Sequence, residues 1–239
     1  MNKPLMLITG GAGFVGSAAC AYYADRFQVL GVDDFSRPRY GSPPEGVLML
    51  HADAACISGI LHQRFDVVLH LAGQVSVVES IADPFNDITR NALLTLQLAN
   101  WAAKCCVGKF IYSSTNKVYG ELRLPLQKCR HTPIMDDEPI NPETPYGISK
   151  ACGGMYVREF LPDAGFDFRQ SCIYGPLQHL HASEDQGWIG YLIRRIRENK
   201  PVFCYGDGNQ VRDLLHVWDL FKAYDLAIDG KITAGSYTV

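Results

Sequence analysis

Long apolar runs, an excess of one charge and C-x-x-C motifs are all missing from this sequence. No stretch reaches the about 18 apolar residues of a membrane-spanning helix, and the apolar run near the start is too short for the core of a secretory signal. The net charge of -3 gives no positive field for nucleic acid. We therefore expect a globular protein of the cytoplasm, with neither a membrane nor nucleic acid as a partner.

The eight cysteines are scattered along the 239 residues. In a chain of this length the pattern is typical of reduced thiols in a cytosolic protein, and not of a disulfide framework. A zinc site would need spaced pairs of Cys and His, whereas His179 and His181 are the only close histidine pair. We therefore expect no metal. The cysteines are Cys20, Cys56, Cys105, Cys106, Cys129, Cys152, Cys172 and Cys204.

A glycine-rich turn follows the first apolar run. Residues 5–9 predict a buried strand, residues 10–16 are Gly-Gly-Ala-Gly-Phe-Val-Gly, and the alanine-rich residues 17–24 predict a helix. Strand, glycine turn and helix in this order form a dinucleotide-binding fingerprint, in which the start of the helix faces the pyrophosphate. Gly10 would permit the tight turn, Gly13 the approach of the pyrophosphate, and Gly16 the packing of helix on strand.

An acidic residue ends the second predicted strand, residues 28–32. Asp33 lies 17 residues after Gly16, close to the spacing at which a carboxylate binds the adenosine ribose. A carboxylate there would repel a 2′-phosphate. The sequence therefore predicts NAD as the cofactor in preference to NADP.

The remaining segments alternate between strand and helix patterns. This alternation predicts an α/β fold, a Rossmann-type doubly wound parallel sheet with an incomplete small substrate-binding region. We expect residues 1–172 and 211–239 to form the NAD-binding domain and residues 173–210 a partial substrate-binding region. Further strands are predicted at 47–50, 66–71, 109–112, 166–172, 202–205, 211–216 and 236–239, helices at 84–105, 146–161, 187–198 and 217–228, and a long loop at 121–143.

Hydroxyl side chains gather at the end of one predicted strand, and a tyrosine and a lysine begin a helix. Ser113 and Thr115 follow residues 109–112, and ligands of doubly wound sheets collect at the carboxyl ends of strands. Pro145 suits the first position of a helix, which places Tyr146 and Lys150 one turn apart on one face. A cation beside a phenol lowers its pKa, so this pair could handle a proton, although Tyr-x-x-x-Lys alone is usually only a surface pattern.

Several motifs together resemble the extended short-chain dehydrogenase/reductase family, the NAD-dependent epimerases and dehydratases of nucleotide sugars. The resemblance covers essentially the whole chain. It rests on residues 9–16, on Tyr-Ser-Ser-Thr-Asn-Lys-Val-Tyr-Gly at 112–120, on Tyr146 to Lys150, and on Gly-Asn-Gln-Val-Arg-Asp at 208–213.

The resemblance implies a role for each matching residue. Tyr146 would be the acid/base, Lys150 would bind the nicotinamide ribose and tune the tyrosine, and Thr115 would hydrogen-bond the reacting sugar hydroxyl. The expected cofactor-binding residues are Gly10, Gly13, Phe14, Val15, Gly16, Asp33, Asp53, Ala54, Leu71, Ala72, Asn91, Ser113, Tyr146 and Lys150. The expected substrate-binding residues are Thr115, Asn116, Gln186, Trp188 and Arg212, the last on the pyrophosphate or, alternatively, in a surface ion pair with Asp213.

Within the family, residues 113–120 and 185–188 are most similar to the branch of 2-epimerases that act on CDP-paratose (CDP-tyvelose epimerases). Asn116 and Lys117 stand where dehydratases carry an Asp-Glu pair, so elimination of water would lack its acid and base. The implied reaction is an epimerisation by transient oxidation of a sugar carbinol, in carbohydrate metabolism such as lipopolysaccharide biosynthesis. Leu94 and Cys172 depart from the residues common in the family, and family members continue past the strand that ends at Val239.

Two other functions remain open. One is a 4-epimerase acting on a UDP-sugar, which would use the same three catalytic residues. The other is a truncated, non-catalytic NAD-binding protein, although a mere binder would need neither Thr115 nor Tyr146. The expected partners are a CDP- or UDP-linked sugar and a second copy of the chain, paired through residues 84–105 and 145–161.

Overall fold

The core of the protein is a seven-stranded sheet in which every neighbouring pair of strands is parallel. The computed structural model describes residues 3–120, 133–178, 187–203, 207 and 211–239. The strand order is β3-β2-β1-β4-β5-β6-β9. The strands are β1 (Leu5–Thr9), β2 (Gln28–Asp33), β3 (Leu48–His51), β4 (Val67–His70), β5 (Lys109–Ser113), β6 (Gly165–Arg169) and β9 (Gly235–Thr238).

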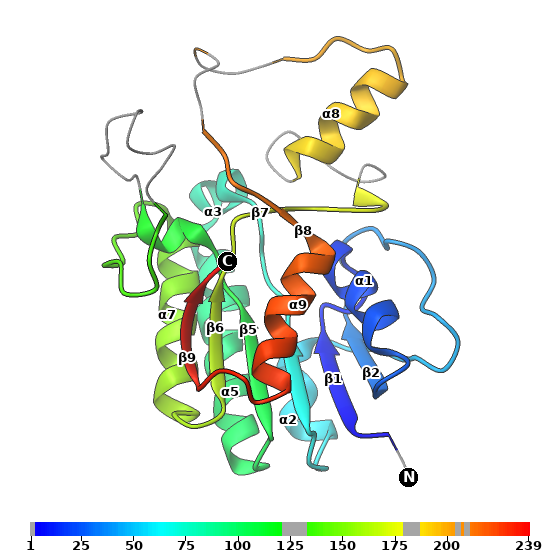
Figure 1. Cartoon of the computed structure of the whole chain (residues 1–239), viewed down its shortest axis with the longest axis vertical. Coiled ribbons are helices and arrows are strands. Elements are labelled where there is room, and N and C mark those ends of the chain that lie inside the picture. Colours follow the sequence, from blue (N-terminus) through cyan, green and yellow to red (C-terminus); the bar gives the residue numbers. More distant parts are fainter. Residues whose placement is uncertain (1–2, 121–132, 179–186, 204–206, 208–210) are drawn as a thin grey trace.

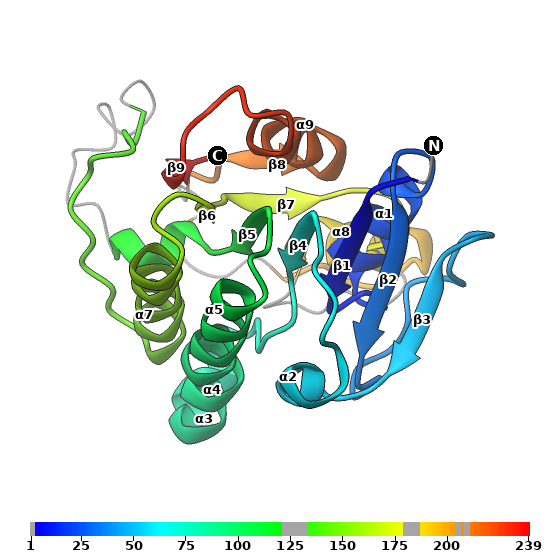
Figure 2. The same cartoon turned by 90° about the horizontal axis from the view of Figure 1, so that it is seen from below.

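Helices cover both faces of the sheet, as Figure 2 shows from below. On one face lie α1 (Phe14–Tyr23) and α9 (Val217–Ile228), and on the other α2 (Ile57–Ile60), α5 (Leu94–Lys104) and α7 (Pro145–Phe160). A hydrophobic core lies on each face of the sheet. Because side chains alternate along a strand, β1 supplies Met6 and Ile8 to the core under α1 and α9, and Leu7 to the core under α2, α5 and α7. Because β1 is buried on both faces, it needs a continuous apolar run. The parallel sheet with helices on both faces confirms the predicted Rossmann-type fold.

The predicted helix at 84–105 forms a continuous helical run with an irregular middle. It consists of α4 (Pro84–Ile88), a π-helical turn (Thr89–Leu93) and α5, and it is preceded by α3 (Val77–Ala82). Asp83 caps α4 by accepting a bond from the Asn86 N–H at 3.0 Å. π-Helical turns are rare in proteins, and those that occur often lie at functional sites. Here the turn contains Asn91, one of the residues expected to bind the cofactor.

The predicted strand at 166–172 is divided between two sheets. β6 ends at Arg169, whereas β7 (Cys172–Tyr174) pairs with β8 (Leu214–His216) in a separate two-stranded sheet. The change occurs because the Ser171 N–H donates to the Val239 carbonyl while the Cys172 N–H donates to the Asp213 carbonyl. The β7–β8 sheet and α8 (Trp188–Arg197) lie beyond the carboxyl ends of the main strands (Figure 1).

Two other predicted strands need correction. Val202 and Phe203 are not in a strand, and the rest of the predicted strand 202–205 lies outside the described residues. Residues 211–213 precede β8 and are exposed, so this part of the predicted strand has no sheet to bury it. In the part of the chain that is described, no helix is both long and apolar enough to cross a membrane.

Candidate active site

The glycine turn between β1 and α1 takes the conformation that its sequence predicts. Gly10 has φ +71°, a left-handed conformation that favours glycine. A Cβ atom on Gly16 would lie 1.9 Å from the Gly10 carbonyl oxygen, so only glycine lets the helix approach the turn. Gly13 is the N-cap of α1, no side chain caps this end, and the first turn has no acidic residue. The start of α1, with Phe14 and Val15, therefore suits an anion such as a pyrophosphate.

Asp33 lies at the carboxyl end of β2 and holds this turn. Its two carboxylate oxygens accept bonds from the Ala12 N–H at 2.9 Å and the Phe35 N–H at 2.8 Å. Each oxygen has a second lone pair, so the half-buried carboxylate can also accept bonds from ribose hydroxyls. Asp53 caps the short 3₁₀ helix η1 (Ala54–Cys56) through the Ala55 N–H at 2.9 Å.

The loop after β4 approaches the glycine turn closely. The Leu71 and Ala72 N–H groups donate to Thr9, to its carbonyl at 3.1 Å and to its hydroxyl at 3.2 Å. A Cβ atom on Gly10 would lie 2.8 Å from the Ala72 nitrogen. The carboxyl ends of β1, β2 and β4 thus surround one open edge, which fits the phosphates and adenosine of a dinucleotide.

The three residues expected to be catalytic lie together at the carboxyl end of β5. Thr115 directly precedes the 3₁₀ helix η3 (Asn116–Tyr119), and its side chain hydrogen-bonds that of Tyr146. Tyr146 and Lys150 are in the first two turns of α7, which begins at Pro145 as predicted. Thr144 caps this helix by accepting a bond from the Gly147 N–H at 3.2 Å.

Lys150 is buried and ties α7 to β5. Its ammonium donates to the Ser113 carbonyl at 2.6 Å and lies 4.6 Å from the centre of the Tyr112 ring. Burial lowers the pKa of Lys150 to about 8, because the charged form loses hydration. The charged form of Lys150 is nevertheless stabilised by this carbonyl and this ring, and by carboxylates deeper in the protein.

The pKa of Tyr146 is shifted in the opposite direction to the one expected from the sequence. Burial of its hydroxyl raises the pKa to about 12, the bond with Thr115 lowers it, and the charge of Asp87 raises it. The expected lowering by Lys150 is wrong for this structure, since burial raises the pKa of Tyr146 and the ammonium of Lys150 is directed to the Ser113 carbonyl. Further positive charge is needed before Tyr146 can act as a base near neutral pH.

Two buried polar clusters beneath this site have no clear signal in the sequence. The ring of His70 bonds the hydroxyls of Thr9 at 2.7 Å and Thr95 at 3.1 Å, and burial and the charge of Lys150 lower its pKa to about 3. Gln170 bonds the hydroxyl of Ser113 and accepts a bond from Tyr224 at 2.9 Å. A histidine at the end of an apolar strand was the available hint for the first cluster. The second joins a strand end to α9 and depends on tertiary packing.

Asn91 is buried under the loop that follows β4. Its amide nitrogen donates to Asp87 and to Ser149, each at 3.1 Å, and its amide oxygen has no partner among the described residues. A Cβ atom on Gly73 would lie 2.5 Å from that oxygen. Asn91 therefore supports α7 and the β4 loop from below.

The residues expected to bind substrate are only partly brought together. Asn116 lies beside Thr115, and its N–H donates to the Gln170 carbonyl at 2.9 Å. Trp188 begins α8 with a buried indole N–H that has no partner in the described part of the chain. Arg212 is exposed and donates to the Val211 carbonyl at 2.8 Å, and no ion pair with Asp213 is found among the described residues. Gln186 lies outside them.

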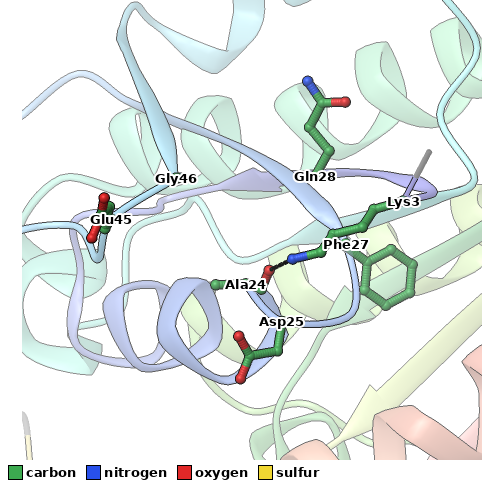
Figure 3. A pocket seen from close by; sticks show the side chains of 7 residues that line it. All are labelled: Lys3, Ala24, Asp25, Phe27, Gln28, Glu45 and Gly46. Atoms are coloured by element: carbon green, nitrogen blue, oxygen red, sulfur yellow. Dashed lines mark hydrogen bonds between the residues drawn. The ribbon is translucent and has the colours of Figure 1, made fainter. Parts of the chain in front are cut away.

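A shallow pocket is present far from these residues (Figure 3). It is lined at the amino ends of β1 and β2 by Lys3, Asp25, Gln28 and their neighbours, and the Lys3 ammonium donates to the Ala24 carbonyl at 2.8 Å. The motifs described above lie at the opposite, carboxyl ends of the same strands. We therefore assign no function to this pocket.

Comparison with known proteins agrees with the motifs and the geometry described above. The model of the NAD dependent epimerase/dehydratase family matches residues 6–238. A CDP-paratose 2-epimerase from Salmonella typhi is 31% identical, over 98% of this chain and 78% of that protein. A putative UDP-glucose 4-epimerase from Methanocaldococcus jannaschii is 29% identical, over 95% of this chain and 74% of that protein. The UDP-glucose 4-epimerase of Thermotoga maritima, solved with UDP-glucose, has a TM-score of 0.86 at 29% identity, covering 98% of this chain and 76% of that one.

The glycine turn, the free start of α1 and the Asp33 carboxylate fit NAD. The family match covers nearly the whole chain, and the related enzymes depend on this cofactor. This chain belongs to the NAD-dependent epimerase/dehydratase family of sugar-nucleotide enzymes.

Proposed function

We propose that this protein epimerises a nucleotide sugar by oxidising one ring carbinol and reducing the ketone on its other face. The observation that carries the proposal is the contact of the Tyr146 and Thr115 side chains one helical turn from the Lys150 ammonium. These groups lie at the sheet edge that bears the dinucleotide turn. A proton acceptor, a hydrogen-bond donor and a cation at one place are what oxidation of a carbinol requires.

Each residue has a defined part in this reaction. Tyr146, as phenolate, takes the proton of the sugar hydroxyl, and Thr115 donates a hydrogen bond to the same oxygen as it becomes a carbonyl. NAD, which the glycine turn and Asp33 would hold, would supply the acceptor and donor of the hydride, and the positive charge of its oxidised form would favour the phenolate. Lys150 holds the end of β5, and its ammonium would bind the nicotinamide ribose. In the return step Tyr146 gives the proton back to the oxygen and the hydride would return to the other face of the carbonyl carbon, so the cycle has no net redox change.

Elimination of water is not supported by the same residues. Asn116 and Lys117 open η3, which contains no carboxylate, whereas a dehydratase needs an acid and a base there. The relatives also include dTDP-glucose 4,6-dehydratases at 28% identity, so likeness alone does not separate the two reactions. The residue types beside Thr115 favour epimerisation.

We infer a substrate linked to CDP or UDP, held over the carboxyl edge by residues 173–210. Trp188 lies in this region with a buried N–H that has no partner among the described residues, and Arg212 follows the region with an exposed guanidinium suited to a diphosphate. The motif at 113–120 and the CDP-paratose 2-epimerase relative favour epimerisation at C2, in a pathway such as lipopolysaccharide biosynthesis. The alternative is a UDP-sugar 4-epimerase, favoured by relatives of that name and by a neighbour solved with UDP-glucose.

We also infer a homodimer and a cytoplasmic location. Large apolar side chains on α3, α4 and α7 are exposed, with Phe85 83% and Ile81 64% accessible. These helices pack against one another, and α4 and α7 lie in the two segments predicted to pair, whereas α3 precedes the first of them. Sedimentation equilibrium of the protein and of Phe85→Asp tests the dimer, which the charge should dissociate. The cysteine pattern supports the cytoplasm.

Incubation with a panel of CDP- and UDP-sugars, followed by NMR of the products, tests the function. We expect one sugar to be interconverted with an epimer, without net production of NADH and without loss of water. Interconversion of a UDP-sugar at C4 would replace the 2-epimerase with the alternative. Bound NAD with no conversion of any sugar would instead support the non-catalytic NAD-binding protein.

A further inference from the structure

Asp87, in α4, is a fully buried carboxylate for which the described residues provide no ion pair. One oxygen accepts a bond from the Ser149 hydroxyl at 2.6 Å, and the other accepts one from the Asn91 amide at 3.1 Å. Both donors are neutral and almost completely buried. Buried carboxylates are costly unless charge-paired, so a carboxylate kept here calls for an explanation from its surroundings.

The bond from Asp87 reaches the helix that carries the proton-handling pair. Ser149 immediately precedes Lys150, and its hydroxyl oxygen is also 3.1 Å from the Tyr146 carbonyl oxygen. α4 packs against α7, so the carboxylate joins the two helices at the turn that lies between Tyr146 and Lys150. A loss of this bond would loosen the turn on which both functional side chains are mounted.

Asp87 also differs electrically from the other groups around Lys150. From β4, His70 is neutral at ordinary pH because its pKa is lowered to about 3, and from β5 the Tyr112 ring carries no charge. From β6, the charge of Asp167 raises the pKa of Lys150 more than that of Asp87 does, and Asp167 is itself paired with Arg169 at 3.2 Å. Asp87 has no ion pair among the described residues, and its charge raises the pKa values of both Lys150 and Tyr146.

The charged groups on the elements beside α4 do not replace the charge of Asp87. Glu79 of α3 is exposed and paired with Arg37 at 2.7 Å. Arg90 of the π-helical turn is exposed and paired with Asp34 at 3.1 Å. Both pairs face solvent, where screening weakens their effect on a buried ammonium.

We propose that Asp87 is a positioning residue of the active site, which anchors α7 through Ser149 and supplies, together with Asp167, the buried negative charge beside the Lys150 ammonium. The proposal rests on the function proposed above for Tyr146 and Lys150. It has a characteristic consequence, because the same carboxylate opposes formation of the Tyr146 phenolate. Asp87 thus displaces the pH range of activity upward at both ends.

The test is Asp87→Asn in the full chain with NAD bound. Asparagine keeps the shape and removes the charge, so the acid limb set by Tyr146 and the alkaline limb set by Lys150 should both move to lower pH. We expect kcat at the original optimum to fall roughly tenfold or more, with KM for the sugar nearly unchanged. Asp87→Glu, which restores the charge, should return both limbs toward their original positions.

Asp83→Asn is the matched control. Asp83 is an exposed carboxylate at the start of the same helix, and asparagine caps a helix equally well. This variant should therefore leave the pH profile unchanged. A change as large as that of Asp87→Asn would attribute the effect to charge on α4 in general and would overturn the proposal.

A second readout does not depend on any sugar. The chain has 12 tyrosines, so phenolate absorbance is titrated in the NAD-bound protein and in its Tyr146→Phe variant, and the difference reports Tyr146 alone. The same pair is measured in the Asp87→Asn background, where the phenolate should form at lower pH. This shift without turnover of any sugar would sustain the role of Asp87 while the proposed function failed.

Unmoved limbs and an unmoved phenolate titration, in a variant that unfolds at the original temperature, would overturn the role of Asp87 even in an active epimerase. If Asp87→Asn fails to fold, Ser149→Ala cuts the anchor and leaves the carboxylate in place. We then expect kcat to fall roughly tenfold with NAD retained. An unchanged kcat in Ser149→Ala would count against the anchor with equal force.

Discussion

The ammonium of Lys150 donates to the carbonyl of Ser113 at 2.6 Å, and this bond joins the helix of the acid/base pair to the strand of the hydroxyl cluster. Lys150 is 5% exposed, so the bond is formed away from water. Hydrogen bonds to charged groups in such surroundings are stronger than those between neutral groups. The relative placement of Tyr146 and Thr115 therefore depends on the charge of a lysine whose pKa is lowered to about 8.

Turnover should decrease as the pH rises through about 8, because Lys150 then loses its proton and its positive charge. Below this pH the ammonium is intact and its bond to the Ser113 carbonyl holds α7 against β5. The measurement is kcat against pH under saturating sugar, with circular dichroism at each pH to show that the protein stays folded. A rate that keeps rising well above this range would show that the charge of Lys150 is dispensable.

Tyr146→Phe should reduce kcat by roughly 10²–10⁴-fold, the range for removal of a general acid/base. The ring is retained, so NAD should stay bound, as shown by the adenine absorbance released on denaturation. Tyr237→Phe in β9, which removes a hydroxyl that donates to the Thr233 carbonyl at 2.6 Å in an exposed hydrogen bond, is the matched control and should keep full activity. Normal epimerisation by Tyr146→Phe would remove Tyr146 from the mechanism.

Gly16→Ala should destabilise the protein by about 1–3 kcal/mol, the usual cost of overpacking. Its Cβ atom would lie 1.9 Å from the Gly10 carbonyl oxygen, so the dinucleotide turn must shift and NAD should be lost. Gly59→Ala in α2 is the matched control, because no atom lies within 4 Å of its Cβ position. Denaturant unfolding and cofactor content of both variants decide the matter, and retention of NAD by Gly16→Ala would refute the role of the turn.

His70 should make the fold sensitive to acid. Its pKa is lowered to about 3 in the folded protein, against about 6.5 in an unfolded chain. Between these values the unfolded chain binds a proton that the folded protein does not, so stability falls as pH falls through this window. At pH 5 the loss from His70 alone is about 2 kcal/mol.

The check is the free energy of unfolding against pH for the protein and for His70→Gln. The variant should lose absolute stability, because a buried hydrogen bond is removed, but its stability should fall less steeply with acid. His62→Gln, at an exposed position, should keep the original slope. Equal slopes in all three proteins would mean that His70 is not buried in its neutral form.

The parallel sheet, the cofactor and the family could all be predicted from the order of residues. Continuous apolar runs, the glycines at 10–16 and the helix start at Pro145 act locally, through backbone conformation and burial, so they are visible in the order of residues. The interactions between distant segments, in contrast, depend on how the chain packs in three dimensions. The pairing of β7 with β8, the bonds of Asp87 to Ser149 and of Gln170 to Tyr224, and the raised pKa of Tyr146 all arise from such packing. A pKa depends on burial and on charges from separate elements, and no local pattern records which of these will prevail.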